Sequence, residues 1–484
     1  MPEIEMTFGG IAGGNYKPLS EESMERIHET VMRVFEEIGI QVNSDKALDL
    51  FRCSDAQVDQ QNRRVTIPRD MVMSLVDKAP SEIILHGRDK KHDIFLGGSR
   101  VYAGTGGTAL NVIDRTNGQK RVAMLNDVKE IAKVVDSLEN IHIFMLPTYP
   151  SDIPVEKVDI NRFFAGLDNS RKHIMGGVYT QKGIDQVIKM AQIIAGSPQK
   201  LRERPIISMI TCSISPFKID SKYGDMLVSI AKAGIPVVCP AEPLTGATAP
   251  VTLAGTLTVQ AVDSLAGVII SQLANPGTPV IFGSVASSTS LRDLKYLTGS
   301  VEMGLLNAAG AQMAQFYNLP FYATGGMTDS NVIDAQCGYE SSITSLLCAL
   351  AGANFIHDAA GLMEFALTVS YEKLVIDNEI LGMVMRAVRG IEVNDETLAF
   401  DVLKEVGPGG HFVSSRHTRT HMRKEHYQPT LSNRKLRERW EKLGSKDTFI
   451  RAKERVEEIL EKPGRRLPQH IRNRILNHFP EIVN

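Results

Sequence analysis

Residues 320–365 read PFYATGGMTDSNVIDAQCGYESSITSLLCALAGANFIHDAAGLMEF. An aromatic, β-favouring run at 321–323 ends at Gly325-Gly326 and passes into a polar loop. Asp334 can cap the long apolar helix that follows, and Gly352 ends that helix. A second short run, 354–358, then leads into a second polar, glycine-containing loop. The stretch therefore predicts a strand–loop–helix–strand–loop unit.

The same alternation of strands and helices extends over most of the chain. Strands are predicted at 141–146, 173–179, 205–211, 235–239, 279–283, 319–323 and 354–358. Helices are predicted at 155–167, 182–195, 221–233, 250–274, 300–317, 335–351 and 369–389. One closing strand is then missing, and we expect it near 411–413. Right-handed crossovers repeated this often favour an α/β fold of the (β/α)8 TIM-barrel type, with a doubly wound open sheet as the alternative.

The two ends of the chain differ from this central part. Residues 20–39 predict a helix that Ser20 caps, and residues 83–122 alternate and carry many glycines, with Asn117-Gly118 as the clearest hairpin turn. The end of the chain is rich in charge and predicts amphipathic surface helices. We therefore expect N-terminal helices and β-hairpins over 1–135, a catalytic barrel over 136–430 and charged C-terminal helices over 431–484.

Composition limits the function. The chain has 484 residues and a formal net charge of −2, which argues against a nucleic-acid scaffold or a polybasic membrane binder. The five cysteines lack CxxC spacing, so neither a disulfide framework nor a thiolate zinc cluster is expected. Because the N-terminal residues lack the pattern of a secretory signal and no apolar run is expected to span a bilayer, we predict a cytoplasmic protein.

Glycine and histidine clusters give weaker signals. The glycine clusters at 105–108 and 407–410 fit neither a Walker nor a dinucleotide fingerprint, so plain turns are favoured. His417 and His421 have the i, i+4 spacing of a shared metal, but no glutamate lies between them and four cationic side chains surround them. We expect no metal site here and favour an anion-binding or interface role.

Polar residues follow nearly every predicted strand, as the active face of a barrel requires. The candidates for catalytic roles are Glu242, Asp329, Asn331 and His357. For single residues the alternatives stay open, because Asp329 can be a turn residue and His357 a hydrogen-bonded core histidine. Acids together with tyrosines and hydroxyls indicate a site for a small organic molecule.

Three blocks of residues carry a family resemblance. They are Gly325-Gly326 through Asp334-Ala335-Gln336 with Tyr339-Glu340, the run GATAPVTLAG at 246–255, and VGPGGHF at 406–412. Together with the closing helices, these blocks resemble the trimethylamine methyltransferase (MttB) superfamily over nearly the full chain. The combination is specific, although each block is short.

The resemblance implies a TIM-barrel, corrinoid-dependent methyltransferase. Such an enzyme moves a methyl group from a methylated amine to Co(I) of a separate corrinoid protein. Founding members carry pyrrolysine, which the resemblance places near 330–332, and this sequence has no such residue. Members without it resemble glycine betaine methyltransferase and relatives that demethylate quaternary amines such as glycine betaine, proline betaine, carnitine and γ-butyrobetaine.

Quaternary-amine chemistry gives the candidate residues specific roles. Aromatic faces and acids bind a quaternary nitrogen, so the substrate-binding candidates are the tyrosines Tyr102, Tyr149, Tyr179 and Tyr322 and, for the negative charge, Glu242, Asp329 or Glu364. For each tyrosine taken alone, a packing role is favoured over a place in the cage. For a betaine carboxylate, the candidates are His357 with Asn331, or Arg292 with Arg416.

The resemblance also implies a partner. Because this chain lacks a DxHxxG-like corrinoid-binding motif, the corrinoid belongs to a cognate corrinoid protein, for which we expect 97–120 and 407–427 to form the walls of a docking rim. The family is compatible with homo-oligomers. Two other classes stay open: a barrel enzyme of another chemistry, such as a lyase or zinc-dependent methyltransferase, and a non-catalytic betaine-binding protein.

Overall fold

Eight parallel strands close into a barrel in the computed structural model, which describes residues 10–483. Residues 1–9, part of the stretch in which no secretory signal is expected, lie outside the described residues. The strands follow one another around the barrel, and the last pairs with the first. They are β7 (Arg100–Thr105), β10 (Ile143–Met145), β11 (His173–Gly177), β12 (Ile207–Ile210), β14 (Val237–Ala241), β15 (Val280–Ser284), β18 (Phe321–Thr324) and β19 (Phe355–Ala360). The predicted barrel fold is confirmed.

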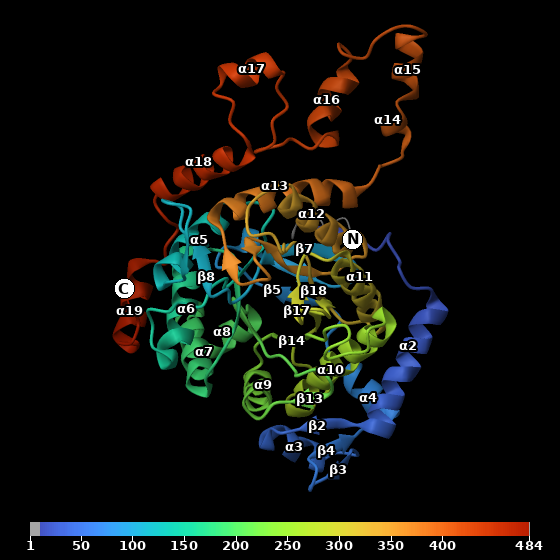
Figure 1. Ribbon diagram of the computed structural model, residues 1–484, viewed down its shortest axis with the longest axis vertical. Helices are drawn as coiled ribbons and strands as arrows, with labels where there is room; N and C mark the ends of the chain where they lie inside the picture. Colours follow the sequence, from blue (N-terminus) through green and yellow to red (C-terminus); the bar gives the residue numbers. More distant parts are fainter. Residues whose placement is uncertain (1–9, 484) are drawn as a thin grey trace.

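A helix follows each barrel strand and covers the outside of the barrel (Figure 1). These helices are α5 (Leu125–Asp136), α6 (Val155–Asn169), α7 (Gln181–Ala195), α9 (Ser221–Ala233), α10 (Leu253–Ala274), α11 (Val301–Phe316), α12 (Ala335–Leu350) and α13 (Tyr371–Arg389). Side chains that the sequence places at helix starts accept backbone N–H bonds there, among them Asp220, Ser300 and Asp334. Local capping thus fixes where several of the helices begin.

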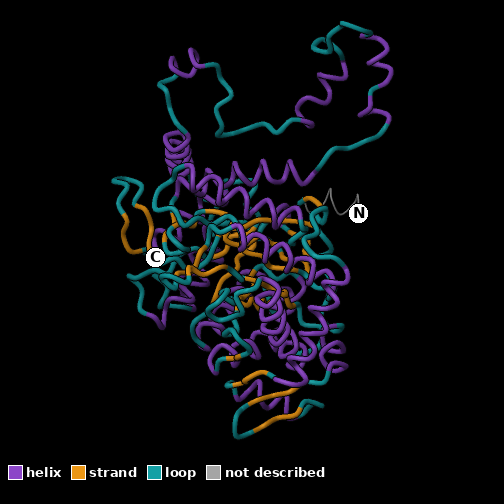
Figure 2. Tube along the Cα trace, turned by 45° about the vertical axis from the view of Figure 1, so that its right-hand side comes forward, coloured by secondary structure: helices purple, strands orange, loops and turns teal. Residues whose placement is uncertain are grey.

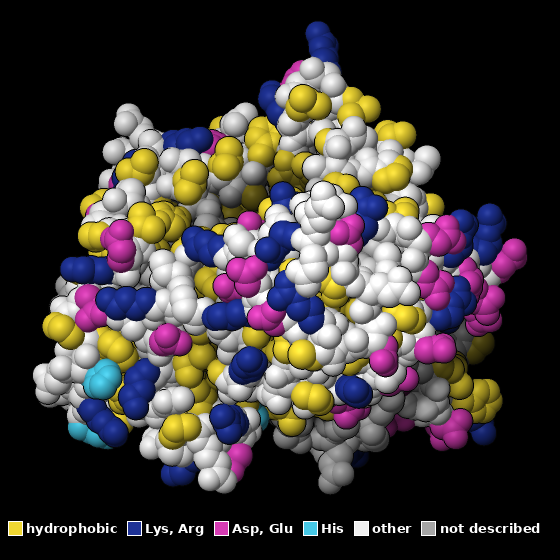
Figure 3. Space-filling view, turned by 90° about the horizontal axis from the view of Figure 1, so that it is seen from below, with side chains coloured by type: hydrophobic (Ala, Val, Ile, Leu, Met, Phe, Trp, Pro, Cys, Tyr) yellow, Lys and Arg dark blue, Asp and Glu magenta, His cyan; other side chains and the backbone are white. Residues whose placement is uncertain are grey.

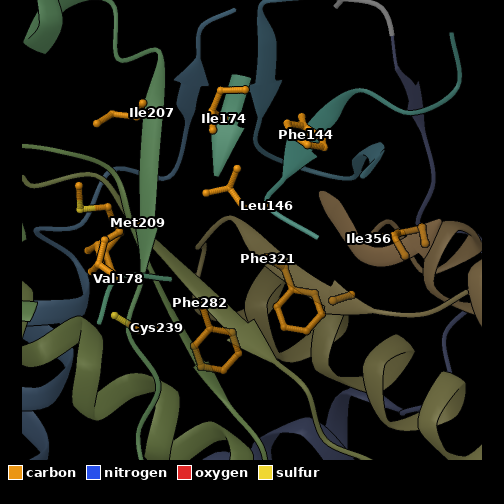
Figure 4. Close-up of a cluster of buried hydrophobic side chains, with 14 of the residues drawn as sticks. Phe144, Leu146, Ile174, Val178, Ile207, Met209, Cys239, Phe282, Phe321 and Ile356 are labelled. Atoms are coloured by element: carbon orange, nitrogen blue, oxygen red, sulfur yellow. The ribbon is translucent and has the colours of Figure 1, made fainter. Parts of the chain in front are cut away.

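Alternation along the strands divides the core into two layers. Phe144, Phe282, Phe321 and Ile356 point outward and pack against the helices (Figure 4). Their sequence neighbours Met145, Ile281, Tyr322 and Phe355 fill the barrel interior. Both faces of the parallel sheet are therefore buried, which explains why its strands read as apolar runs.

The eighth strand is not where the sequence indicates. It is β7, inside the predicted N-terminal segment, so this segment contributes a strand to the barrel and does not only pack on it. Residues 411–413 form no strand and lie between the last helices of the chain. The run RVYAGT is flanked by glycine pairs and resembles a hairpin strand, while its parallel partner β19 is about 250 residues away and leaves no local signal.

The floor of the barrel is closed by an antiparallel hairpin, β5 (Ile83–Leu85) with β6 (Ile94–Leu96), whose apolar side chains join the interior cluster. A second hairpin, β8 (Asn111–Ile113) with β9 (Lys120–Val122), turns at the predicted Asn117-Gly118. A further N-terminal unit contains α2 (Glu21–Arg33), α3 (Asp45–Arg52), α4 (Arg69–Val76), β2 (Ile40–Val42), β3 (Gln57–Asp59) and β4 (Arg64–Thr66). In Figure 1, α3 and these strands lie below α9, and α2 and α4 lie beside α10.

Beyond α13 the chain leaves the barrel as an arm and then returns. The arm contains α14 (Asp395–Leu398), α15 (Phe400–Val406) and α16 (Arg416–Glu425), and it stands clear of the barrel in Figures 1 and 2. It is followed by α17 (Arg437–Lys442), by α18 (Thr448–Glu461), which packs on α13 and α5, and by α19 (Gln469–His478), which packs on α7. Residues 407–427 therefore project beyond α13, and the expectation that they line the barrel mouth is wrong.

One helix, α10, is long and apolar enough to cross a membrane, contrary to the expectation that no segment would be. In the fold, 78% of its apolar stretch is buried against the barrel and neighbouring helices, so it is a core helix. The face seen in Figure 3 mixes acidic, basic and scattered hydrophobic side chains, in keeping with the near-zero net charge.

Candidate active site

The carboxyl ends of the eight strands meet at the mouth of the barrel. Counting in steps of two from Val238 and Phe355, which face the interior, places Glu242 and His357 on the inner side at the strand ends. Glu242 is exposed to solvent. Desolvation among the surrounding protein atoms nevertheless raises its pKa to about 7, with a smaller contribution from the charge of Asp358. Glu242 thus contacts solvent while surrounding protein atoms partly desolvate its carboxyl group.

His357 makes three contacts in the mouth. Its ring stacks on Tyr322, with 4.3 Å between centroids. The Thr324 hydroxyl donates to the Ser284 carbonyl, so the Thr324 oxygen accepts from His357 Nδ1–H at 2.9 Å. His357 Nε2 lies 2.8 Å from Asp358 Oδ2. Both ring nitrogens of His357 are therefore engaged by protein groups.

Adjacent residues of a regular strand point to opposite faces, so this His–Asp contact needs an irregular backbone. Pairing between β19 and β7 shifts register between Ile356 and Ala360, and Asp358 has φ +61°. Asp tolerates this left-handed conformation at a cost on the order of 1 kcal/mol. Gly107 N–H donates to Asp358 Oδ1 at 3.2 Å and holds the carboxylate in place.

Gly106 makes room for that carboxylate. A Cβ at this position would lie 2.3 Å from Asp358 Oδ1 and 2.1 Å from Leu362 Cδ1, far inside van der Waals contact. The glycine pair that the sequence suggests is a plain turn thus packs directly against the site.

A tyrosine outside the strands also reaches this site. Tyr296 lies in β17 (Lys295–Leu297), which pairs with β16 (Ser288–Ser290) in a hairpin inserted after β15. Its hydroxyl is buried and has no hydrogen-bond partner within residues 10–483. Burial raises the pKa of Tyr296 well above its usual range, and the charges of Glu242, Asp358 and Asp329 raise it further. Tyr296 therefore faces the acidic side of the mouth.

The Glu242 carboxylate itself accepts no hydrogen bond from the described part of the chain. Next to it lies the exposed thiol of Cys212, at the end of β12. Burial raises the pKa of this thiol to about 12, and the charge of Glu242 adds to the effect. The thiol is therefore neutral at physiological pH, and Glu242 is an acid of the mouth that no described residue pairs.

Two other acids are already engaged. Asp329 Oδ1 accepts from both Thr298 N and Thr298 Oγ1, each at 2.7 Å, and so anchors the loop that follows the β16–β17 hairpin. Glu364 Oε2 binds Lys120 Nζ at 2.6 Å and accepts from the Thr368 hydroxyl. Both carboxylates therefore hold together the loops around the mouth and are not free to bind a ligand. Asn331 is exposed on the loop after β18.

The four predicted tyrosines do not form one cage. Tyr102 is fully buried at the floor of the barrel, where its hydroxyl accepts from Phe95 N, so its predicted contact with substrate is wrong. Tyr149 and Tyr179 form an edge-to-face pair with 5.3 Å between centroids. The Arg162 guanidinium lies 5.5 Å from the Tyr179 ring centroid and thus already provides a cation at that ring. Tyr322 is buried directly behind His357.

Comparison of the sequence with known proteins assigns the chain to a family. The family model described as trimethylamine methyltransferase (MTTB) matches residues 4–479. The chain belongs to this family. It is 38% identical to trimethylamine methyltransferase MttB of Desulfitobacterium hafniense over 93% of the chain and 90% of that protein. It is 35% identical to glycine betaine methyltransferase of another strain of that species, over 92% of each.

Solved structures confirm the fold of this MTTB-family chain. The monomethylamine methyltransferase (MtmB) of Methanosarcina barkeri superposes with a TM-score of 0.51 over 95% of this chain and 91% of that one, at 14% identity. At this identity the likeness concerns the fold alone.

Within this MTTB-family chain, the histidines of the arm lie apart from the site. The rings of His417 and His421 are 4.3 Å apart, and His421 Nε2 lies 3.3 Å from Glu396 Oε1. No group of three or more His, Cys, Asp or Glu side chains within the described residues could hold a metal ion.

The sequence assigns no role to Asp358, and two other residues of the mouth were missed as site candidates. Asp358 follows His357 in the strand, and a regular strand would turn it away from the mouth. Tyr296 lies in an insertion rather than at a strand end, so the strand-end rule does not reach it. Cys212 was considered only for disulfides and thiolate zinc clusters, although it follows β12 at an inward position that alternation could have identified.

Proposed function

We propose that this MTTB-family protein transfers a methyl group from a quaternary amine to the Co(I) of a separate corrinoid protein. The observation that carries the proposal is the unbonded Glu242 carboxylate inside an open barrel mouth, beside the aromatic residue Tyr296. The 35% identity to a glycine betaine methyltransferase and the absence of pyrrolysine from the sequence support the same substrate class.

The charge and bonding of the mouth suit such a cation. A quaternary nitrogen has no N–H to donate, so it binds through its charge and through aromatic faces. Glu242 accepts no hydrogen bond within residues 10–483 and is free to face such a cation. The Asp358 carboxylate contacts His357 Nε2 and accepts from Gly107 N–H, so it is already engaged and Glu242 is the acid left to face the cation.

The proposed reaction needs no proton transfer from the protein to the leaving amine. When a methyl group leaves a quaternary nitrogen, the product is a neutral tertiary amine, and no general acid is needed to expel it. Catalysis then rests on holding the methyl in line with its acceptor. Glu242 and Tyr296 would bind the nitrogen, while the contact between His357 and Asp358 keeps these two side chains in place.

The acceptor must reach the mouth from outside. The corrinoid supplies a nucleophilic cobalt and belongs to a partner protein. Exposure of Glu242 and Cys212 supports access from solvent. The β8–β9 hairpin pairs through β8 with β21 (Thr368–Val369), in the loop after β19. We therefore keep 97–120 as a docking wall of this rim.

For a betaine, the substrate carboxylate needs a cation. His357 is occupied by Thr324 and Asp358, and Arg416 lies in the arm. Arg292 is exposed at the turn of the β16–β17 hairpin, close in sequence to Tyr296, and forms no ion pair with any described residue. We therefore favour Arg292 as the carboxylate contact.

The proposal includes a location and a domain division. All five cysteines are free thiols, as expected in the reducing cytoplasm. We assign the protein to the cytoplasm and retain a division into N-terminal additions, barrel and C-terminal helices, with β7 counted in the barrel.

Two measurements test the proposal in sequence. Calorimetry should show that glycine betaine binds, whereas 3,3-dimethylbutanoate, which has the same shape but carbon in place of the charged nitrogen, does not. Equal affinity for the two compounds would show that the mouth does not recognise the positive charge and would exclude the proposed cation site. Methylation of a reduced corrinoid protein then separates an enzyme from a betaine-binding protein, and turnover without a corrinoid partner would point to another barrel chemistry.

A further inference from the structure

Gly177, the last residue of β11, is a glycine that the chain itself does not require. It lies two residues beyond Met175, which belongs to the interior cluster, so alternation turns it toward the inside of the barrel. A Cβ added at Gly177 would meet no atom within 4 Å, and its φ lies outside the left-handed region that favours glycine. The neighbouring Gly176 differs, because a Cβ there would lie 2.8 Å from Leu146 Cδ1. Within the described chain, neither backbone conformation nor packing therefore accounts for a glycine at 177.

Solvent reaches Gly177 although the residue faces the inside of the barrel. Together with the empty surroundings of its missing side chain, this exposure shows that Gly177 borders open space. Glycine weakens a strand, and in a sheet it often marks a place where a ligand approaches closely. A ligand in this space would explain the glycine.

The open space lies on the same side of the barrel as Glu242. Gly177 pairs with Ile210 of the next strand, β12, and Ile210 pairs with Val238 of β14. Cys212 is one inward step beyond Ile210, and Glu242 is two inward steps beyond Val238. Gly177 is therefore deeper in the barrel than Cys212 and Glu242.

The interior residues nearest to the mouth are apolar. Met145 of β10 and Ile210 of β12 have the highest exposure in the interior cluster, 6% and 7%, and their strands flank β11. The space at Gly177 thus combines apolar side chains below with the carboxyl of Glu242 above. Apolar side chains favour the burial of CH₂ groups, and a carboxylate favours a positive nitrogen.

We propose that Gly177 determines how large the carbon substituents on the substrate nitrogen can be. The inference rests on the proposed function, in which Glu242 binds a quaternary nitrogen. The methyl to be transferred faces out of the mouth, toward its acceptor, and two of the other substituents point down toward Met145 and Ile210. Because position 177 has no side chain, these two substituents can be joined in a ring. The substrate class is thereby extended to quaternary amines whose nitrogen belongs to a five-membered ring.

Two cations without a carboxylate isolate the effect of size. Tetramethylammonium has four methyl groups, whereas N,N-dimethylpyrrolidinium has two of its substituents closed into a ring. Calorimetry should show that the wild type binds the ring cation at least as tightly as tetramethylammonium. Gly177→Ala should lower the affinity for the ring cation roughly tenfold more than the affinity for tetramethylammonium, and Gly177→Val should increase that difference.

The melting temperature separates this role from a structural one. Because no atom opposes the added side chain and valine favours strands, Gly177→Val should melt at the wild-type Tm or above it. Gly338→Ala is the matched control, because a Cβ there also meets no atom within 4 Å and Gly338 lines a groove between α12 and α13, outside the barrel. It should leave the ratio of the two affinities at the wild-type value.

The outcomes distinguish this inference from the proposed function. Equal losses of affinity for the two cations, or no loss for either, in the Gly177 variants would overturn the role of Gly177 and leave that of Glu242 intact. A wild type that binds tetramethylammonium but not the ring cation would also overturn it. A wild type that binds neither cation would overturn the proposed function and this inference with it.

Discussion

His357 and Asp358 are consecutive residues of one barrel strand, yet His357 Nε2 lies 2.8 Å from Asp358 Oδ2 inside the barrel mouth. The left-handed backbone of Asp358 and the shift in strand pairing bring both side chains to the same face. Beta-bulges of this kind redirect side chains next to active sites. The contact engages the Asp358 carboxylate at the mouth and leaves Glu242 as the acid available to a ligand.

Glu242→Gln removes that charge at nearly constant shape. If Glu242 binds the quaternary nitrogen, kcat/KM for methyl transfer from a quaternary amine should fall roughly 30-fold, equal to about 2 kcal/mol. Initial rates of corrinoid methylation measure the change. Glu302→Gln removes an exposed carboxylate at the start of α11 and should leave the rate unaltered. An unchanged rate in Glu242→Gln would exclude the carboxylate from substrate binding.

Binding of the cation should depend on pH through the same group. Burial raises the pKa of Glu242 to about 7, so the carboxyl is largely protonated below that value and ionised above it. A cation binds the ionised form, so affinity for tetramethylammonium should rise as pH increases through about 7 and then level off. Calorimetry between mildly acidic and mildly alkaline buffer measures this profile. Glu242→Gln should give a flat profile, and a wild-type affinity that falls with rising pH would contradict the assignment.

Gly106→Ala tests the packing against Asp358. The added methyl would overlap Asp358 Oδ1 and Leu362, which must displace the carboxylate from His357. A shift of the site by about 1 Å should lower kcat roughly 100-fold. Gly338→Ala is the matched control, because Gly338 lies in helix α12 and a Cβ there would meet no atom within 4 Å. That control should keep full activity and an equal or higher Tm, since alanine favours helix. Full activity in Gly106→Ala would show that the position of Asp358 is not critical.

Tyr296 offers a comparison of ring and hydroxyl. Its hydroxyl has no partner within residues 10–483, so Tyr296→Phe should keep the affinity for tetramethylammonium and should not lower the Tm. Tyr296→Ala removes the aromatic face and should weaken binding about tenfold. Calorimetry with both variants separates the two contributions. Equal, strong loss in both variants would assign the binding to the hydroxyl, and no loss in either would remove Tyr296 from the site.

The sequence predicts the barrel well because its periodic strands and capped helices are local features. Seven of the eight strands, from β10 to β19, lie where the apolar runs place them. The strand β7 was missed because its partners β10 and β19 are distant in sequence and because the flanking glycines favour a hairpin. Non-local pairing thus explains both the missing strand and the wrong placement near 411–413.

The residues of the site also differ in how far the sequence predicts them. Glu242 and His357 follow from their positions at strand ends, whereas Asp358 required a bulge that no residue pattern indicates. Tyr102 faces inward as expected, but it lies at the start of its strand and therefore at the floor of the barrel. Glu364 and Asp329 are acids at strand ends whose partners, Lys120 and Thr298, come from other loops. Only the folded chain shows which acids are already engaged.

The measurement that tests the central claim most directly is methylation of a Co(I)-reduced corrinoid protein, followed by its absorption spectrum. The panel should contain trimethylamine, glycine betaine, proline betaine and carnitine, and the corrinoid protein should be one that another methyltransferase already methylates. The account predicts that methyl-Co(III) forms with a quaternary amine and that Glu242→Gln slows its formation. Methylation from trimethylamine alone, or equal rates in the wild type and Glu242→Gln, would contradict it.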